Sequence, residues 1–241
     1  MNLVIDIGNS FTKLAFFEQD SIVEKYQFEN NSEHLIKELN GFKQTDKAIV
    51  SSVNNSLSEI LENSIKNLTK NILFFNYKTK IPIENKYTAK KTLGLDRLAA
   101  IIGANHLFLN SNILVFDAGT ALTIDFINKN NQYLGGNISP GLEMRFNSLH
   151  NYTSKLPLVK KSENFQELGK TTEEAIISGI QKGMIYEIDS YINDFKKNYD
   201  DLKIVFTGGD SFFFEKKLKN TIFANPNLVL IGLHKVLKFN V

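Results

Sequence analysis

The sequence predicts an α/β protein, and two observations support that class. Apolar segments of strand length alternate along the chain with segments whose apolar residues recur at helical spacing. The chain also repeats one short pattern. Val4 to Ser10 and Val115 to Thr120 are each an apolar strand followed by Asp-x-Gly and a nearby hydroxyl residue. The two aspartates, Asp6 and Asp117, lie 111 positions apart in a chain of 241 residues. This duplication indicates two similar halves that face each other across a cleft.

The composition is ordinary for a globular protein, with 42% hydrophobic and 22% charged residues. The formal net charge of +2 gives no reason to expect nucleic acid as a partner. The absence of cysteine excludes disulfides, thiolate catalysis and cysteine-based metal sites. No apolar run approaches the roughly 20 residues of a membrane span, and Met1 to Gly8 lacks the pattern of a signal peptide. We therefore expect a cytoplasmic protein without a membrane partner.

In the first half, the apolar spacing predicts a hairpin, two helices and two further strands. The hairpin strands cover 3–5 and 14–17, the helices 33–39 and 57–68, and the other strands 48–50 and 72–75. The second of these helices is expected to bury one face, made of Leu57, Ile60, Leu61, Ile65 and Leu68. The polar segment 76–92 is expected to be a loop or an inter-domain segment.

The later elements continue the alternation. Strands are predicted over 112–116, 122–127, 202–207 and 228–230, and helices over 98–109, 171–195 and 212–218, with a last helical turn at 233–237. The segment 133–141 is rich in glycine and is predicted to be a turn-rich loop. The long helix begins with a capping box of Thr171 and Glu174, and its Gly179 and Gly183 are expected to pack on another helix. The two halves are expected to be 1–110 and 111–241.

The first repeated motif has the residue types of a phosphate-binding turn. Gly8 allows backbone N–H groups to approach an anion closely. Polar donors and a positive charge follow, from Asn9, Ser10, Thr12 and Lys13. Asp6 lies at the strand end and suits a hydrated magnesium ion. The alternative is a plain hairpin turn with no ligand.

The second copy, Asp117 to Thr120, would supply the opposing phosphate loop, with Asp117 orienting a cation and Thr120 donating to a phosphate oxygen. Thr207 to Asp210 follows another strand, where ligands of α/β sheets bind. The glycines of 133–141 would let a substrate lie against the backbone. Each of these segments has a structural alternative as a simple turn.

Gly94 to Arg97 precedes a predicted helix and joins a carboxylate to a guanidinium. Asp96 is suited to act as a general base toward a hydroxyl during phosphoryl transfer. Arg97 is suited to bind a carboxylate of the substrate through two hydrogen bonds. The alternative is that Asp96 only caps the helix.

These motifs, taken in order, resemble type III pantothenate kinase over almost the whole chain. Six segments carry the resemblance: Asp6 to Ser10, Gly94 to Arg97, Asp117 to Ala121, Gly135 to Gly141, Thr171 to Gly179 and Thr207 to Asp210. Ser10 stands where the family usually has threonine, and it retains the hydroxyl group.

The resemblance implies two ribonuclease-H-like halves of the acetate and sugar kinase, Hsp70 and actin fold around a nucleotide cleft. It also implies transfer of the ATP γ-phosphate to the primary hydroxyl of pantothenate, the first step of coenzyme A biosynthesis. Mg²⁺ would accompany ATP, and a monovalent cation, K⁺ or NH₄⁺, would bind at Asp117. The family forms homodimers, so a homodimer is expected.

The resemblance also assigns roles to residues of this chain. Asp96 matches the proton acceptor of the family. The ATP-binding positions match Asp6, Ile7, Gly8, Asn9, Ser10, Phe11, Thr12, Lys13 and Thr120. The substrate-contacting positions match Tyr87, Gly94, Leu95, Asp96, Arg97 and Thr172.

Two other functions are compatible with this fold: another small-molecule kinase, and a regulatory protein without catalysis. A protein that only binds its ligand needs no carboxylate base. The presence of Asp6, Asp96 and Asp117 together therefore argues against the regulatory protein.

Overall fold

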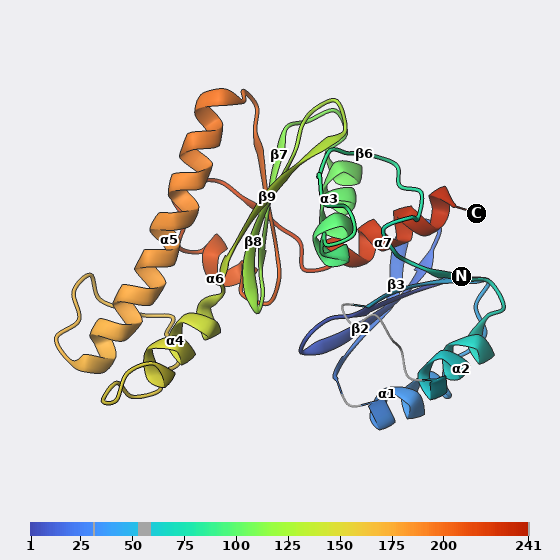
Figure 1. Cartoon of the computed structure of the whole chain (residues 1–241), viewed down its shortest axis with the longest axis horizontal. Coiled ribbons are helices and arrows are strands. Elements are labelled where there is room, and N and C mark those ends of the chain that lie inside the picture. Colours follow the sequence, from blue (N-terminus) through green and yellow to red (C-terminus); the bar gives the residue numbers. More distant parts are fainter. Residues whose placement is uncertain (31, 53–58, 241) are drawn as a thin grey trace. The chain divides into compact units, whose positions relative to one another are not determined.

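The computed structural model describes residues 1–30, 32–52 and 59–240 (Figure 1). Its chain forms two compact units. The first contains Met1–Leu107, Asn131–Tyr133 and Asn227–Val241, and the second contains Phe108–Asn130 and Leu134–Pro226. Within the described residues, no helix is both long and apolar enough to cross a membrane.

The first sheet has the order β3-β2-β1-β4-β5. Its strands are β1 (Asn2–Ile7), β2 (Phe11–Glu18), β3 (Ser21–Glu29), β4 (Lys47–Ser52) and β5 (Ile72–Phe74). β1 runs antiparallel to β2 and parallel to β4, and β4 runs parallel to β5. The predicted hairpin and the strands after it are therefore confirmed.

The second sheet has the order β11-β10-β7-β8-β9-β6. Its strands are β6 (Glu84–Asn85), β7 (Ile113–Ala118), β8 (Ala121–Ile127), β9 (Gln132–Pro140), β10 (Lys203–Thr207) and β11 (Phe223–Ala224). β7 is antiparallel to β8 and parallel to β10. The run β9-β8-β7-β10-β11 thus repeats the order and the central pairings of the first sheet, which confirms the duplication read from the two Asp-x-Gly motifs.

The helices belong to one unit or the other. The first unit contains α1 (Ser32–Leu39), α2 (Glu59–Leu68), α3 (Leu95–Leu107) and α7 (Leu228–Phe239). The second contains α4 (Leu142–Asn151), α5 (Thr172–Asn198) and α6 (Ser211–Glu215). The capping box at the start of α5 is present: Thr171 accepts from the N–H of Glu174, whose side chain accepts from the N–H of Thr171.

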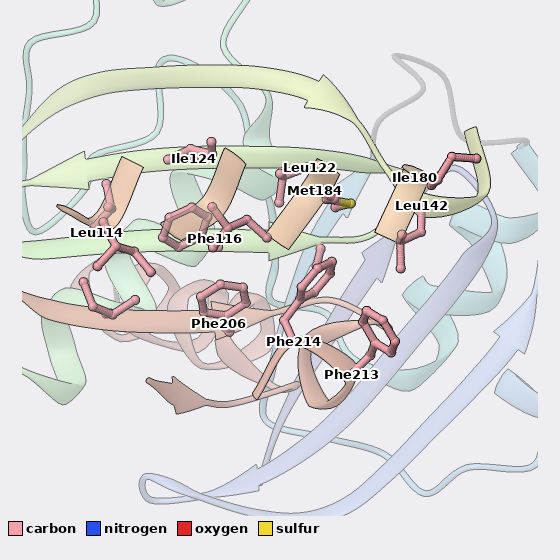
Figure 2. Packing of buried hydrophobic residues seen from close by; sticks show 14 of the residues in the cluster. Leu114, Phe116, Leu122, Ile124, Leu142, Ile180, Met184, Phe206, Phe213 and Phe214 are labelled. Carbon is pink, nitrogen blue, oxygen red and sulfur yellow. The ribbon is translucent and has the colours of Figure 1, made fainter. Parts of the chain in front are cut away.

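Each unit has its own apolar core. In the first unit, alternate residues of β1 and β2 pack with α1 and α2, as the burial of Leu3, Ile5, Leu39 and Ile65 shows. In the second unit, Phe116 of β7 stacks on Phe206 of β10 with ring centroids 4.7 Å apart (Figure 2). The buried face of α5 covers these strands. This packing fixes the ends of β1 and β7, where the two Asp-x-Gly turns begin.

Two predicted elements were wrong. The segment 133–141 is a strand, β9, and not a turn-rich loop. Its glycines permit close pairing, because a Cβ at Gly136 would lie 2.1 Å from the carbonyl oxygen of Ile124 on β8. The predicted strand 228–230 is helical, and together with the predicted helical turn 233–237, which is confirmed, it forms one helix, α7. An apolar run that is buried on most sides does not distinguish a helix from a strand.

Two predictions about packing were also wrong. Within the described part of the chain, Gly179 and Gly183 do not contact another helix, because a Cβ at either glycine would meet nothing there within 4 Å. On α2, Leu61, Ile65 and Leu68 are buried, but Ile60 is 64% exposed, and Leu57 lies outside the described residues. The buried stripe of α2 is therefore narrower than the apolar spacing suggested.

The polar segment 76–92 is mostly irregular, as expected, and it lies within the first unit rather than between the units. Its short strand β6 pairs with Gln132 and Tyr133, at the start of β9. This pairing positions the residues that lead into α3.

Candidate active site

Asp6 lies near the end of β1, where the hairpin turn to β2 begins. It is 8% exposed and aligns with Lys13 on β2 and Ser51 on β4. The turn closes with the N–H of Gly8 donating to the carbonyl of Phe11 at 3.0 Å. The predicted ATP-binding segment, 6–13, is therefore one continuous hairpin, and its buried carboxylate belongs to the last part of β1, just before the turn.

Asn30, the residue after β3, holds this turn in place. Its Nδ2 donates to the carbonyl oxygens of Gly8 at 2.7 Å and Asn9 at 2.9 Å. Its backbone N–H donates to the carbonyl of Ser10 at 3.2 Å. Its Oδ1 accepts a 2.8 Å hydrogen bond from the hydroxyl of Thr12, which is 1% exposed. Asn30 thus bonds to each of Gly8, Asn9 and Ser10, and these hydrogen bonds restrain the turn.

The second Asp-x-Gly turn brings two oxygen atoms close to Gly208, and one of them, the carbonyl oxygen of Ala118, also accepts a 3.0 Å hydrogen bond from the N–H of Asp210. Gly208 has a φ of 89°, and a Cβ there would lie 2.5 Å from both Oδ1 of Asp117 and the carbonyl oxygen of Ala118. Carboxylate and carbonyl oxygens suit a weakly hydrated monovalent cation. The residues at Asp117 therefore fit the expected K⁺ or NH₄⁺ ion.

The expected Mg²⁺ fits a site that is completed by phosphate and water. Among the described residues, no group of three or more His, Cys, Asp or Glu side chains is placed to hold a metal ion. Magnesium commonly keeps several waters and binds through one or two carboxylates together with substrate phosphates. Asp6, at the start of the phosphate turn, is a carboxylate of that kind.

Asp96 lies in the first turn of α3, and its neighbours control where its carboxylate points. Oδ1 accepts a 2.8 Å hydrogen bond from the N–H of Arg97, one of the helix-start donors that lack a partner within the helix. A Cβ at Gly94 would lie 2.5 Å from the same oxygen. The glycine therefore makes room for the carboxylate, and the hydrogen bond at the helix start is compatible with the expected role of Asp96 as a general base.

Arg97 is 6% exposed, and its guanidinium lies over the ring of Tyr87, 5.8 Å from the ring centroid. Tyr87 in turn lies parallel to the fully buried Tyr133, with ring centroids 6.1 Å apart. The guanidinium of Arg97, the ring of Tyr87 and the ring of Tyr133 thus lie one after another in space. Arginine commonly stacks on aromatic rings, and its planar guanidinium is able to bind a carboxylate through two hydrogen bonds.

The predicted site residues divide between the two units. The first unit contains residues 6–13, Tyr87 and 94–97, and it brings Tyr87 and Arg97 into contact. Asp117, Thr120 and Thr172 belong to the second unit. There, Thr120 is exposed beside Gly141, whose Cβ would lie 2.4 Å from the carbonyl oxygen of Thr120, and Thr172 is the exposed first residue of α5.

Sequence reasoning missed two residues of this site, Asn30 and Tyr133. Each is remote in sequence from the group that it contacts, and neither lies in a motif that carries chemistry. The only available signals were indirect: an Asn at the end of a strand, where its side chain commonly bonds to nearby backbone, and a large aromatic residue beside a glycine pair.

Comparisons with known proteins point to one family. The sequence profile of type III pantothenate kinase matches residues 2–194. The type III pantothenate kinase of Phocaeicola vulgatus is 42% identical over 240 residues, which cover 100% of this chain and 99% of the relative.

Two solved structures resemble the chain. A protein of Campylobacter jejuni described as a Baf family transcriptional activator has a TM-score of 0.66 and 27% identity, covering 99% of this chain and 98% of that one. A protein of Sinorhizobium meliloti described as a 2-dehydro-3-deoxygalactonokinase has a TM-score of 0.56 and 9% identity, with 99% of each chain covered. The second likeness concerns the fold alone, and it agrees with two ribonuclease-H-like halves. Taken with the profile match and the full-length relative, these findings show that the chain belongs to the type III pantothenate kinase family.

Proposed function

We propose that this protein transfers the γ-phosphate of ATP to the primary hydroxyl of pantothenate, forming 4′-phosphopantothenate and ADP in the first step of coenzyme A biosynthesis. The observation that carries the proposal is the start of α3. There, a carboxylate that Gly94 leaves room for lies next in sequence to a buried arginine. A hydroxyl acceptor with a carboxylate elsewhere in the molecule, such as pantothenate, matches this pair.

In the reaction, Asp96 accepts the proton of the substrate hydroxyl as the oxygen attacks the γ-phosphorus in line with the leaving ADP oxygen. Arg97 holds the substrate carboxylate, and Tyr87 keeps the guanidinium in position. Gly94 and Leu95 complete the substrate contacts of this segment, and Thr172 is a further substrate-contacting position of the proposal. The bond from oxygen to the γ-phosphorus forms, and the bond to ADP breaks.

The ATP phosphates are bound by the hairpin turn Asp6 to Lys13 and by Thr120. Backbone N–H groups of the turn and the ammonium group of Lys13 offset the phosphate charge. Asp6 would hold Mg²⁺ through water, and Asp117 with the carbonyl of Ala118 would hold K⁺ or NH₄⁺. When bound, these cations neutralise charge that develops on the phosphates.

The same proposal covers the assembly, the location and the domains of the protein. We expect a homodimer in the cytoplasm, with ribonuclease-H-like halves at 1–110 and 111–241. The C-terminal helix α7 is the last helix of the second half in chain order but packs in the first unit. Sedimentation of the purified protein tests the dimer directly, because a mass equal to one chain would contradict it.

The test of function is ADP release by the purified protein with ATP, Mg²⁺ and pantothenate, first in potassium and then in sodium buffer. We expect turnover that depends on pantothenate and falls when sodium replaces potassium. Asp96→Asn should lower kcat about 10²–10⁴-fold while ATP binding is retained. Wild-type turnover by Asp96→Asn would contradict the role of the base, and turnover without pantothenate dependence would indicate another acceptor.

The alternative of a non-catalytic regulator is not favoured. The description of the Campylobacter jejuni structure as a transcriptional activator belongs to that protein. Good ATP binding by the wild-type chain without turnover toward any hydroxyl acceptor would revive this alternative.

A further inference from the structure

The carbonyl groups of the first phosphate turn all point toward one residue. Asn30 bonds to the carbonyl oxygens of Gly8, Asn9 and Ser10, two of them through its side-chain amide. These three peptide groups belong to the turn between β1 and β2, which contains a glycine and is therefore intrinsically free to adopt several conformations. The hydrogen bonds from Asn30 restrict this conformational freedom of the turn.

The hydrogen bonds to Asn30 also determine the direction of the neighbouring backbone N–H groups. In a trans peptide the C=O of one residue and the N–H of the next point in opposite directions, and no cis peptide bond occurs among the described residues. Because the carbonyls of Gly8 and Asn9 point toward Asn30, the N–H groups of Asn9 and Ser10 point to the opposite side of the turn. N–H groups attract an anion, whereas carbonyl oxygens repel it.

We propose that Asn30 is a positioning residue for ATP: it holds the carbonyls of the turn away from the phosphates and thereby presents the N–H groups of Asn9 and Ser10 to them. The buried hydroxyl of Thr12, which donates to Oδ1 of Asn30, orients the amide for this task. The inference rests on the proposed function, because it takes the turn as the place where the phosphates of ATP bind.

The test compares ATP with adenosine, which lacks phosphates, by isothermal titration of each variant. Asn30→Ala should raise the dissociation constant for ATP about tenfold and leave that for adenosine unchanged. In turnover, KM for ATP should rise while KM for pantothenate stays the same. Thr12→Val should act in the same direction with a smaller effect, because the amide remains but is no longer oriented.

The matched control is Asn71→Ala. Asn71 is another exposed asparagine of the first unit whose Nδ2 donates to a backbone carbonyl, that of Asp46 at 3.2 Å. This variant should bind ATP like the wild type. If Asn30→Ala does not fold, Asn30→Asp takes its place: it keeps the size of the side chain and the acceptor for Thr12 but cannot donate to the two carbonyls, so it too should weaken ATP binding.

Unchanged ATP affinity in the Asn30 variants would overturn the inference, and so would an equal loss of ATP and adenosine binding, which indicates a general structural effect. The two proposals fail separately. A wild type that binds ATP in an Asn30-dependent manner but does not phosphorylate pantothenate overturns only the proposed function. A wild type that phosphorylates pantothenate while Asn30→Ala and Asn30→Asp bind ATP normally overturns only this inference.

Discussion

A side chain at position 94 would occupy the space of the Asp96 carboxylate. A Cβ there would lie 2.5 Å from Oδ1 of Asp96 and 3.5 Å from Cδ of Arg97. A base displaced by about 1 Å costs about 100-fold in rate. We therefore expect Gly94→Ala to lower kcat about 100-fold in the ADP-release assay, with KM for ATP unchanged because the phosphate turn is untouched.

Gly41→Ala is the control for this substitution. A Cβ at Gly41 would lie 3.4 Å from the carbonyl oxygen of Glu38, an ordinary contact distance, so this variant should retain the wild-type kcat. A Gly94→Ala enzyme with the kcat of the wild type would show that the observed position of the Asp96 carboxylate is not the one used in catalysis.

At the residue scale, the sequence predicts those features of the site that depend on neighbouring residues in the chain. The Asp-x-Gly turns and the segment Gly94 to Arg97 combine a glycine with charged or polar residues within a few positions. Their chemistry can therefore be predicted without knowledge of the fold. The contact between Tyr87 and Tyr133 joins residues that are far apart in sequence. This contact forms because β6 pairs with the start of β9. A strand of two residues has no local sequence pattern from which it could be predicted.

At the scale of elements, two helices of the first unit touch through their backbones. A Cβ at Gly232 of α7 would lie 1.8 Å from the carbonyl oxygen of Ala99 on α3, and one at Gly103 of α3 would lie 2.2 Å from that of Leu228. Overpacking costs typically 1–3 kcal/mol. Gly232→Ala should therefore lower the free energy of unfolding, measured with denaturant, by about 2 kcal/mol.

The matched control for this prediction is Gly179→Ala on α5, where a Cβ would meet nothing within 4 Å. Alanine is favoured over glycine in a helix by about 1 kcal/mol, so this variant should be more stable than the wild type. The same change thus has opposite effects on two helices. A stability loss in Gly179→Ala would instead indicate that this face of α5 contacts a second molecule.

The two glycine pairs also explain an error of sequence reasoning. Gly179 and Gly183 have the spacing of a helix contact, but spacing alone does not show what faces the glycines. Gly103 and Gly232, which make the actual contact, lie on different helices, α3 and α7. The apolar pattern beside Gly232 predicted a strand over 228–230. The composition of β9 misled in a similar way, because glycine is typical of loops and also permits close strand pairing.

At the scale of the whole molecule, the duplication was the most predictable feature. Two copies of a strand followed by Asp-x-Gly, separated by close to half of the chain, predicted two similar halves, and the run β9-β8-β7-β10-β11 of the second sheet repeats the strand order of the first. The compact units could not be predicted in the same way. α3 follows β6 and α7 follows β11, two strands that are far apart in the chain, and the two helices pack together in the first unit. The chain end therefore returns to the unit in which the chain begins.

That return places His234 of α7 in the interior of the first unit. The imidazole is 1% exposed, stacks on Phe17 with ring centroids 4.0 Å apart, and lies 3.3 Å from Nδ2 of Asn2. Burial lowers the pKa of His234 to about 4, against the opposing effect of Asp20 and with a contribution from Lys235 and Lys238 in the same direction as burial. The histidine is therefore neutral in the folded protein at neutral pH.

Stability should consequently fall as the pH is lowered from about 6.5 to about 4. In this range the unfolded chain takes up a proton at position 234 and the folded chain does not, so acid favours unfolding, by on the order of 3 kcal/mol in total.

His234→Phe keeps a ring against Phe17 but cannot be protonated, so the difference between wild type and variant isolates this residue from other titrating groups. Asp20, whose pKa is lowered to about 2, acts mainly below this range. When unfolding by denaturant is measured at pH 7, 6, 5 and 4, the free energy of unfolding should fall more steeply with decreasing pH in the wild type than in the variant. Parallel curves for the two proteins would mean that His234 takes up its proton as readily in the folded protein as in the unfolded chain.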